Sequence, residues 1–125
     1  AGDLARAAIE AVAWDVARCL EAMSTTRPPT GTTLAGGGAG APIWVEIITS
    51  VTGLPGVRRR WDEVASAGAA ALTARAVGID VDLGRLNPVA AEVRPAAATV
   101  ACYRRLRPFA DRVAGAVLTL ATDCP

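Results

Sequence analysis

Apolar residues recur at steps of three and four near the start of the chain and predict a helix from Asp3 to Met23. Arg6 and Glu10 lie four residues apart and are expected to pair on its exposed side. Trp14 falls outside the apolar stripe, so we expect it to cover a surface or to contact a part of the protein outside this chain. The expected apolar face consists of Ile9, Val12, Val16, Cys19 or Leu20, and Met23.

The next segment alternates between short extended runs and turns, with one further helix between them. Pro28 and Pro29 end the first helix, and a strand is expected from Thr32 to Ala35. A second helix is predicted from Pro42 to Thr52, because proline suits the first helical position and an apolar stripe follows. We expect Gly53 to end this helix, and a short strand to run from Leu54 to Arg59. The stripe consists of Ile43, Ile47 and Val51, widened by Trp44 and Ile48.

The second half of the chain predicts two more helices. Asp62 is expected to cap a helix that runs to Val77 and ends at Gly78, with a face of small residues around Gly68 and Ala71. Residues 78–94 are expected to form an irregular connector. A last helix is predicted over 96–121, bent by Pro108, and its apolar stripe consists of Leu106, Phe109, Val113, Ala116 or Val117, and Leu120.

This order of elements predicts an α/β fold with helices packed on a sheet of two or three short strands. So small a sheet normally continues into further structure. At 125 residues the chain is one domain or part of one. Because it begins with an amphipathic helix and no initiator Met, we expect it to be a piece of a longer protein.

Charge and composition exclude several functions. A net charge of +1 argues against nucleic-acid and membrane partners, and no apolar run reaches the roughly 18 residues of a membrane span. The chain has no His, and all its basic residues are Arg. It therefore lacks the lysine of a P-loop or a pyridoxal Schiff base and the histidine of a catalytic triad or metal site.

The cysteines and carboxylates predict neither a disulfide framework nor a metal site. The three cysteines have no CxxC spacing, so we expect reduced thiols, with Cys19 and Cys102 buried in helices and Cys124 at the tail. The loop and tail carboxylates show no metal-ligand spacing and are expected to face solvent; they are Asp80, Asp82, Glu92 and Asp123.

The candidate chemistry lies in "GGGAGAP", which joins an expected strand to the start of an expected helix. Free backbone N–H groups and the helix dipole favour an anion at such a place, and glycines let a ligand approach the backbone. The segment is therefore a candidate for binding phosphate or nucleotide. The alternative is a tight turn that needs glycine for conformational reasons alone.

Trp44 and a run of arginines that ends in Trp61 each have a functional and a structural interpretation. Trp44 could stack on a base, but its place in the apolar stripe favours packing in the core. The segment "VRRRW", which ends at Trp61, could bind phosphate or nucleic acid. Three arginines are few and no aromatic residues alternate with them, so a solvated strand end is favoured.

Four segments, in order and at matching spacing, resemble the C-terminal end of carbohydrate kinases of the FGGY family, and xylulokinase-like members in particular. The segment "LAGGGAGAPIWVEIITSVTGLP" and the "GAA" of the helix after it are the more specific part. The others are "RAAIEAVAWDVARCLEAM", "EVASAGAAALTA" and "NPVAAEVRPAAATVACYRRLRPF".

The resemblance implies that residues 1–125 are the C-terminal, nucleotide-binding portion of a sugar kinase with a partial actin-like ATPase (ribonuclease H-like) fold. The complete protein would transfer the γ-phosphoryl group of ATP, with Mg²⁺, to a ketose such as xylulose or to a polyol, in the cytoplasm. The nucleotide would lie against Gly36, Gly37, Gly38 and Ala39, with Pro42 near the adenine. The sugar contacts and the catalytic base belong to the N-terminal domain, so no catalytic residue is expected here.

The sequence departs from the family pattern just after the glycines. Members often carry a basic residue and a serine where this chain has Gly40 and Ala41, and a glutamine where it has Glu46. Nucleotide contacts would then rest more on backbone groups, and we expect Gly38→Val to weaken them by occupying phosphate space. The alternative hypothesis is a non-catalytic α/β binding or interaction module on a kinase scaffold. Exposed apolar surface could also make the chain a homodimer.

Overall fold

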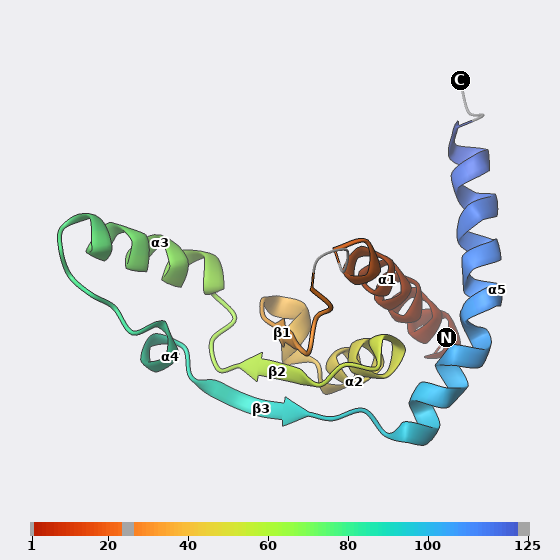
Figure 1. Ribbon diagram of the computed structural model, residues 1–125, viewed down its shortest axis with the longest axis horizontal. Coiled ribbons are helices and arrows are strands. Elements are labelled where there is room, and N and C mark those ends of the chain that lie inside the picture. The colour runs from red at the N-terminus through yellow and green to blue at the C-terminus, as the bar shows by residue number, and fades with distance from the viewer. Residues whose placement is uncertain (1, 24–26, 123–125) are drawn as a thin grey trace.

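The computed structural model describes residues 2–23 and 27–122, which form helices around a small three-stranded sheet (Figure 1). Helices α1, α2 and α5 surround the core, while α3 lies at the far end of the molecule from α5. In chain order the elements are α1 (Gly2–Met23), β1 (Thr32–Leu34), the 3-10 turn η1 (Gly37–Gly40), α2 (Pro42–Thr52), β2 (Gly56–Arg59), α3 (Val64–Ala76), α4 (Leu83–Leu86), β3 (Val89–Val93) and α5 (Ala97–Thr122).

The sheet has the strand order β1-β2-β3. Strands β1 and β2 are parallel, with Thr32 opposite Gly56 and Leu34 opposite Arg58. Strand β3 is antiparallel to β2, and the register shifts between Arg58 and Arg59. Because β1 and β2 are parallel, the segments that follow their carboxyl ends meet at one edge of the sheet, and this edge carries the glycine turn.

Helix α2 is the centre of the core and has the predicted bounds. Pro42 occupies its first turn, and Gly53 ends it in the left-handed conformation (φ 71°), where its N–H donates to the carbonyl of Thr49. The Thr49 hydroxyl, fully buried, donates to the carbonyl of Val45 at 3.0 Å, so burial leaves it satisfied. The core cluster consists of Ala13, Trp14, Ala17, Ile47, Ile48, Val51 and Tyr103.

Helix α1 buries a face that overlaps only in part with the predicted one, since Ile9 and Val16 pack against the core as expected. Ala13 and Ala17 are buried, and Trp14 lies in the core with its ring edge-on to Tyr103, at 6.0 Å between centroids. The prediction that Trp14 covers a surface was therefore wrong. Val12 and Met23 of the expected stripe are exposed. Small alanine side chains allow α1 and α2 to approach closely. This close packing, rather than the spacing of the larger apolar residues, determines which face of α1 is buried.

Other local predictions also need correction. The expected irregular connector contains α4 and β3, so the sheet has a third strand. Glu63 rather than Asp62 occupies the N-cap of α3, and its side chain makes no cap bond. Cys19 and Cys102 lie in helices but are exposed, because both sit on faces that turn away from the core. Cys124 lies outside the described residues.

Several charged side chains bond to groups close to them along the chain. Arg6 pairs with Glu10 as predicted, at 2.8 Å. The Asp82 carboxylate caps α4 by accepting from the N–H groups of Gly84 and Arg85.

Among the helices in the described part of the chain, none is long and apolar enough to cross a bilayer.

Candidate functional site

The glycine turn follows β1 and leads directly into α2. Gly36 has φ 88°, in the region that favours glycine, and redirects the chain out of the sheet. Residues 37–40 then form the 3-10 turn, in which the N–H of Ala39 donates to the carbonyl of Gly36 at 2.9 Å. The N–H of Ala41 donates to the carbonyl of Gly38 at 3.2 Å. The turn is thus a defined structure that directs the start of α2.

The open part of this turn is its first half. The N–H groups of Gly37 and Gly38 open the 3-10 turn, a position where N–H groups have no partner within the helix itself. A Cβ atom placed on Gly36 or on Gly37 would meet no other described atom within 4 Å. Ala39, by contrast, is buried and its N–H is used inside the turn. Open space therefore lies at Gly36 and Gly37, next to the N–H groups of Gly37 and Gly38.

Trp44 closes one side of the turn. A Cβ atom on Gly38 would lie 3.3 Å from the indole Nε1 of Trp44, so the ring lies against this glycine. The same ring packs against the core cluster, which confirms core packing as its role. A valine at position 38 would press on Trp44 besides entering ligand space, so this variant cannot report on the ligand alone. Pro42 is exposed at the first position of α2.

Asp62 approaches the turn from the end of β2, a proximity that sequence reasoning missed. A Cβ atom on Gly40 would lie 3.6 Å from the Oδ2 atom of Asp62. A carboxylate there would repel an anion, which makes Gly40 the less favourable end of the turn for one. The parallel pairing of β1 and β2 brings the glycine turn close to Asp62. A prediction of that pairing is what could have revealed this proximity.

Asn87 holds the segment after β2 in place. Its side chain accepts from the N–H of Trp61 and donates to the carbonyl of Trp61, both at 2.9 Å. Its own carbonyl accepts from the guanidinium of Arg59 at 3.1 Å, and the guanidinium of Arg60 lies over the Trp61 ring at 5.1 Å. Two of the three consecutive arginines therefore have local partners at the end of the strand.

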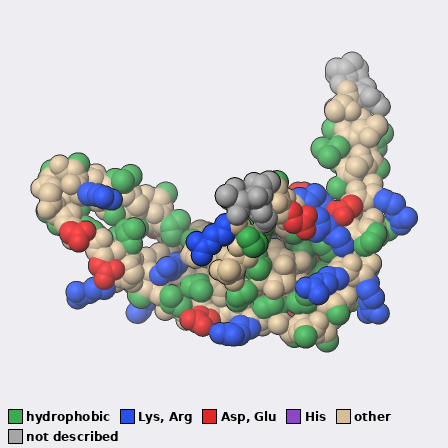
Figure 2. Space-filling model, viewed as in Figure 1, with side chains coloured by type: hydrophobic (Ala, Val, Ile, Leu, Met, Phe, Trp, Pro, Cys, Tyr) green, Lys and Arg blue, Asp and Glu red, His purple; other side chains and the backbone are tan. Residues whose placement is uncertain are grey.

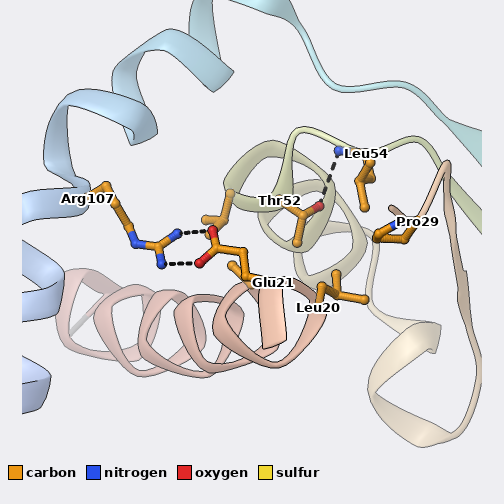
Figure 3. A pocket seen from close by; sticks show the side chains of 8 residues that line it. Leu20, Glu21, Pro29, Thr52, Leu54 and Arg107 are labelled. Atoms are coloured by element: carbon orange, nitrogen blue, oxygen red, sulfur yellow. Dashed lines mark hydrogen bonds and ion pairs between the residues drawn. The ribbon is translucent and has the colours of Figure 1, made fainter. Parts of the chain in front are cut away.

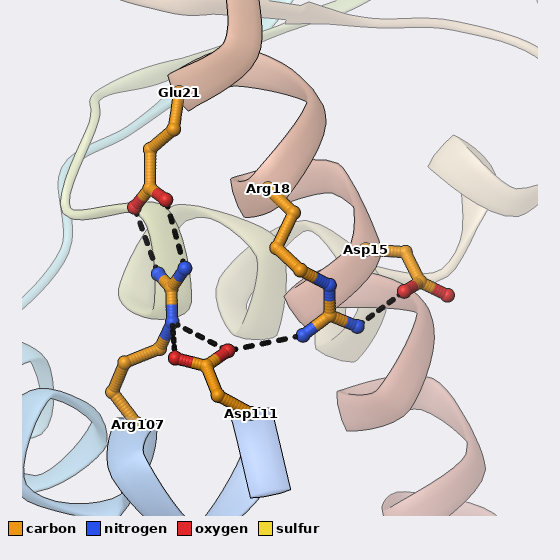
Figure 4. Close-up of polar contacts among 5 residues, drawn as sticks. All are labelled: Asp15, Arg18, Glu21, Arg107 and Asp111. Atoms are coloured by element: carbon orange, nitrogen blue, oxygen red, sulfur yellow. Dashed lines mark hydrogen bonds and ion pairs between the residues drawn. The ribbon is translucent and has the colours of Figure 1, made fainter. Parts of the chain in front are cut away.

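A second group of polar residues joins α1 to α5 (Figure 4). The guanidinium of Arg107 donates two hydrogen bonds of 2.8 Å to the carboxylate of Glu21 and also bonds to Asp111. Arg18 bonds to Asp111 and to Asp15. The hydrogen bonds that Arg107 donates lower the pKa of Glu21, and those that Glu21 and Asp111 accept raise the pKa of Arg107. These groups neutralise one another and fix the two helices.

A small cavity of about 200 Å³ lies beside the Glu21–Arg107 pair (Figure 3). The polar atoms at its wall are already committed, because Glu21 bonds to Arg107 and the Thr52 hydroxyl donates to the carbonyl of Ile48 at 2.8 Å. We therefore read it as a packing gap between helices. Its remaining lining residues are Ala17, Leu20, Pro29, Val51 and Leu54.

Tyr103 anchors the other end of the α1–α5 contact. Its hydroxyl donates to the carboxylate of Glu10 at 2.7 Å and accepts from the guanidinium of Arg6 at 3.1 Å. Burial, followed by the hydrogen bond to Glu10, raises the pKa of Tyr103. This arrangement keeps the phenol protonated and makes it a structural group.

Among the described residues, the arrangement best suited to a ligand is the glycine turn. Across residues 2–23 and 27–122, no three His, Cys, Asp or Glu side chains gather into a group that could hold a metal ion. The N–H groups and open space of the glycine turn fit the phosphates of a nucleotide. No set of described carboxylates fits a Mg²⁺ ion held by protein ligands alone.

Comparison with known proteins identifies the family and the fold of the chain. The model of the "FGGY family of carbohydrate kinases, C-terminal domain" matches residues 1–77. No curated protein matches the chain. Similar solved structures include the ligand-bound xylulose kinase of Lactobacillus acidophilus, with a TM-score of 0.79 and 20% identity over 92% of this chain and 24% of that one. The gluconate kinase of the same organism has a TM-score of 0.78 and 20% identity, over 91% of this chain and 24% of that one.

A third similar structure is the xylulose kinase of Rhodospirillum rubrum, with a TM-score of 0.76 and 22% identity over 95% of this chain and 25% of that one. The chain thus spans about a quarter of the length of these structures. The likeness shows the fold, a mixed α/β part of an actin-like ATPase domain with helices packed on a small sheet. The family match covers more than half of the sequence, and the chain belongs to the FGGY family of carbohydrate kinases, in the region of their C-terminal domain.

Proposed function

We propose that this chain supplies part of the ATP-binding wall of a kinase that phosphorylates a sugar, either a ketose such as xylulose or a polyol. Membership of a carbohydrate kinase family supports the reaction class. The relatives with similar structures are described as xylulose and gluconate kinases, which supports a small sugar or sugar acid as the acceptor. A cytoplasmic location belongs to the same proposal, since ATP and such sugars are available there.

In this proposal the phosphates of ATP lie against Gly36, Gly37 and Gly38. The observation that carries the proposal is the open space at Gly36 and Gly37 beside the first N–H groups of the turn, those of Gly37 and Gly38. Ala39 supports the turn from its buried side, and exposed Pro42 lies on the path of the nucleoside. The Asp62 carboxylate keeps phosphate away from the Gly40 end.

ATP supplies the phosphoryl group, and Mg²⁺ neutralises the charge of its phosphates. The chain's own residues bind and orient the nucleotide through backbone groups. In the proposal, the acceptor sugar, its catalytic base and the remaining phosphate contacts come from the part of the kinase that this chain does not span.

Calorimetric titration of the chain with Mg-ATP and with ADP tests nucleotide binding at the turn. Gly37→Val is the variant of choice, because its side chain enters the open space without touching Trp44. Gly68→Val is the matched control, since a Cβ there also meets no described atom within 4 Å and lies in α3. We expect Gly37→Val to weaken binding about tenfold or more, or about 1.4 kcal/mol, and Gly68→Val to leave it unchanged.

Equal affinity in both variants would place the nucleotide elsewhere. A chain that binds neither nucleotide would favour the non-catalytic binding module instead. The sugar is tested separately, by measuring ATP consumption of the complete kinase with pentuloses, hexuloses, polyols and gluconate. Absence of turnover with every one of these acceptors would contradict the proposed reaction.

A further inference from the structure

The last residue of the glycine turn, Gly40, faces the carboxylate of Asp62. Apart from chain neighbours, the Oδ2 atom of Asp62 is the only described atom that a Cβ placed on Gly40 would meet within 4 Å, at 3.6 Å. That distance is an ordinary contact, and Gly40 does not have the positive φ that favours glycine. Gly40 therefore borders open space beside a carboxylate, and its backbone conformation does not require glycine there.

The Asp62 carboxylate has no hydrogen-bond or ion-pair partner in the part of the chain that the structure describes. It does not cap α3, because Glu63 occupies the N-cap and no side chain bonds there. The main-chain carbonyl of Asp62, not its side chain, accepts from the N–H of Val64 at 2.8 Å. The carboxylate is thus available to accept a hydrogen bond from a ligand.

The main chain that leads to Asp62 is held in place. The N–H and carbonyl of Trp61 both bond to the side chain of Asn87 at 2.9 Å, and Asn87 is buried. The N–H of Arg60 donates to the carbonyl of Pro88, also at 2.9 Å. These hydrogen bonds fix the two residues before Asp62, and such support is what a ligand-contacting side chain needs to act selectively.

A carboxylate at this place favours one part of a nucleotide over another. It accepts hydrogen bonds and donates none, so it repels phosphate oxygens and attracts N–H and O–H groups. In the proposed function the phosphates lie at Gly36–Gly38 and the nucleoside extends toward Pro42, so Gly40 falls between them along the chain. The donors of adenosine are the exocyclic amino group of its base and the hydroxyl groups of its ribose.

We propose that Asp62 is a specificity-determining residue of the nucleotide site. Its carboxylate accepts a hydrogen bond from a donor of the nucleoside, either the exocyclic amino group of adenine or a ribose hydroxyl group. This inference rests on the proposed function, because it requires the phosphates at the glycine turn. It adds that the chain selects its nucleotide by the nucleoside as well as by the phosphates.

The test compares Mg-ATP with three analogues that each lack one donor, in calorimetric titrations of the whole chain. Purine riboside triphosphate lacks the amino group, while 2′-deoxy-ATP and 3′-deoxy-ATP each lack one hydroxyl group. The measured quantity is the ratio of the Kd of each analogue to the Kd of ATP. We expect at least one analogue to bind about tenfold more weakly than ATP, because its missing donor leaves a charged acceptor unpaired. That analogue identifies the donor.

Asp62→Ala removes the acceptor and should bring this ratio close to unity. The ratio is the informative quantity, because the loss of a negative charge alone strengthens the binding of every triphosphate equally. Gly40→Arg should also remove the discrimination, since a guanidinium at this position pairs with the Asp62 carboxylate.

Asp80→Ala is the matched control and should leave every ratio unchanged. Asp80 is an exposed aspartate in the connector between α3 and α4, a part of the molecule where Figure 2 shows acidic side chains at the surface. Circular dichroism should show the wild-type helix content in all three variants.

Equal affinity of the wild-type chain for ATP and all three analogues would overturn this inference and leave the phosphate site at the turn in place. Discrimination that survives Asp62→Ala, or that Asp80→Ala also removes, would overturn it as well. Absence of binding by every nucleotide would contradict the proposed function itself, and this inference with it.

Discussion

At the scale of single residues, the contact between α1 and α5 depends on polar side chains that satisfy one another. Tyr103 is buried, yet its hydroxyl donates to Glu10 and accepts from Arg6. At the other end, Glu21 holds Arg107, whose guanidinium lies over the Trp14 ring at 5.6 Å. The helices are therefore fixed at both ends, one end buried and the other open to solvent.

Tyr103→Phe should lower the free energy of unfolding by about 1 kcal/mol, since it removes a hydrogen bond but keeps the ring against Trp14. Tyr103→Ala should cost about 3 to 5 kcal/mol, because it also leaves a cavity. Urea denaturation monitored by Trp fluorescence measures both changes. Equal losses in the two variants would show that the ring contributes nothing, contrary to its place in the core.

The Glu21–Arg107 pair should make stability depend on pH. The pKa of Glu21 is lower in the folded chain than its ordinary value of 4.5, chiefly because of the Arg107 hydrogen bonds. A lowered pKa adds stability above pH 4.5, and this stability is lost as the pH falls through the folded-state pKa. Because the Glu21 side chain is 63% exposed, solvent screening limits the contribution to about 0.2 to 1 kcal/mol.

Comparison with Glu21→Gln measures this effect. Wild type should be the more stable at pH 7, and the difference should shrink as the pH falls below about 4.5. Glu63→Gln is the matched control, because Glu63 makes no side-chain cap bond at the start of α3. A constant difference across the pH range would show that the ion pair has no role.

At the scale of elements, the sheet is positioned by the close contact of β2 with α2. A Cβ atom on Gly56 would lie 2.6 Å from Cγ2 of Thr49 and 3.0 Å from Cδ1 of Leu34. Because Gly56 has no side chain, the backbone of β2 packs directly against Thr49 of α2 and Leu34 of β1. Any side chain at this position would collide with them. The glycine turn depends on this contact, because β1 leads into the turn.

Gly56→Ala should destabilise the chain by about 1 to 3 kcal/mol, because neither the buried Thr49 nor the strand can move away freely. Gly68→Ala provides the control, since it adds a methyl group in open space on a helix and should stabilise by up to about 1 kcal/mol. Thermal denaturation followed by circular dichroism compares them. A neutral Gly56→Ala would contradict the close packing of α2 on the sheet.

The elements that the sequence predicted well are those whose ends are marked by residues within the element or next to it. Helix α2 has a proline at its start and a left-handed glycine at its end, and its bounds match the prediction. Strand β3 was missed because "VAAEV" is rich in alanine, which has low strand propensity, and its pairing with β2 is a long-range contact. The buried face of α1 was predicted only in part, because alanine gives little periodic signal although it decides how closely helices pack.

The candidate site likewise combines features that local sequence predicts with contacts that appear only in the folded chain. The strand, glycine turn and helix around Gly36–Gly38 follow from local sequence. The closeness of Asp62 to Gly40 depends on the parallel pairing of β1 and β2, which no local pattern reveals. The indole of Trp44 beside Gly38 likewise appears only in the folded chain.

At the scale of the whole molecule, parts of the described chain lie away from the core. It spans about a quarter of the length of its structural relatives. Helix α3, described along its entire length, has no buried residue, and half of α5 projects from the body. The glycine turn instead has a buried residue, Ala39, and internal hydrogen bonds, so we expect ligand binding at the turn to be measurable on this chain.

The most direct measurement is an NMR titration of the ¹⁵N-labelled chain with Mg-ATP. The account predicts that the backbone amide signals of Gly37 and Gly38 shift most and saturate, with smaller shifts at Gly36 and Ile43. Inorganic phosphate should shift the same amides more weakly. Unmoved Gly37 and Gly38 signals at saturating Mg-ATP, or shifts confined to another element such as α3, would contradict the claim that this turn binds the phosphates.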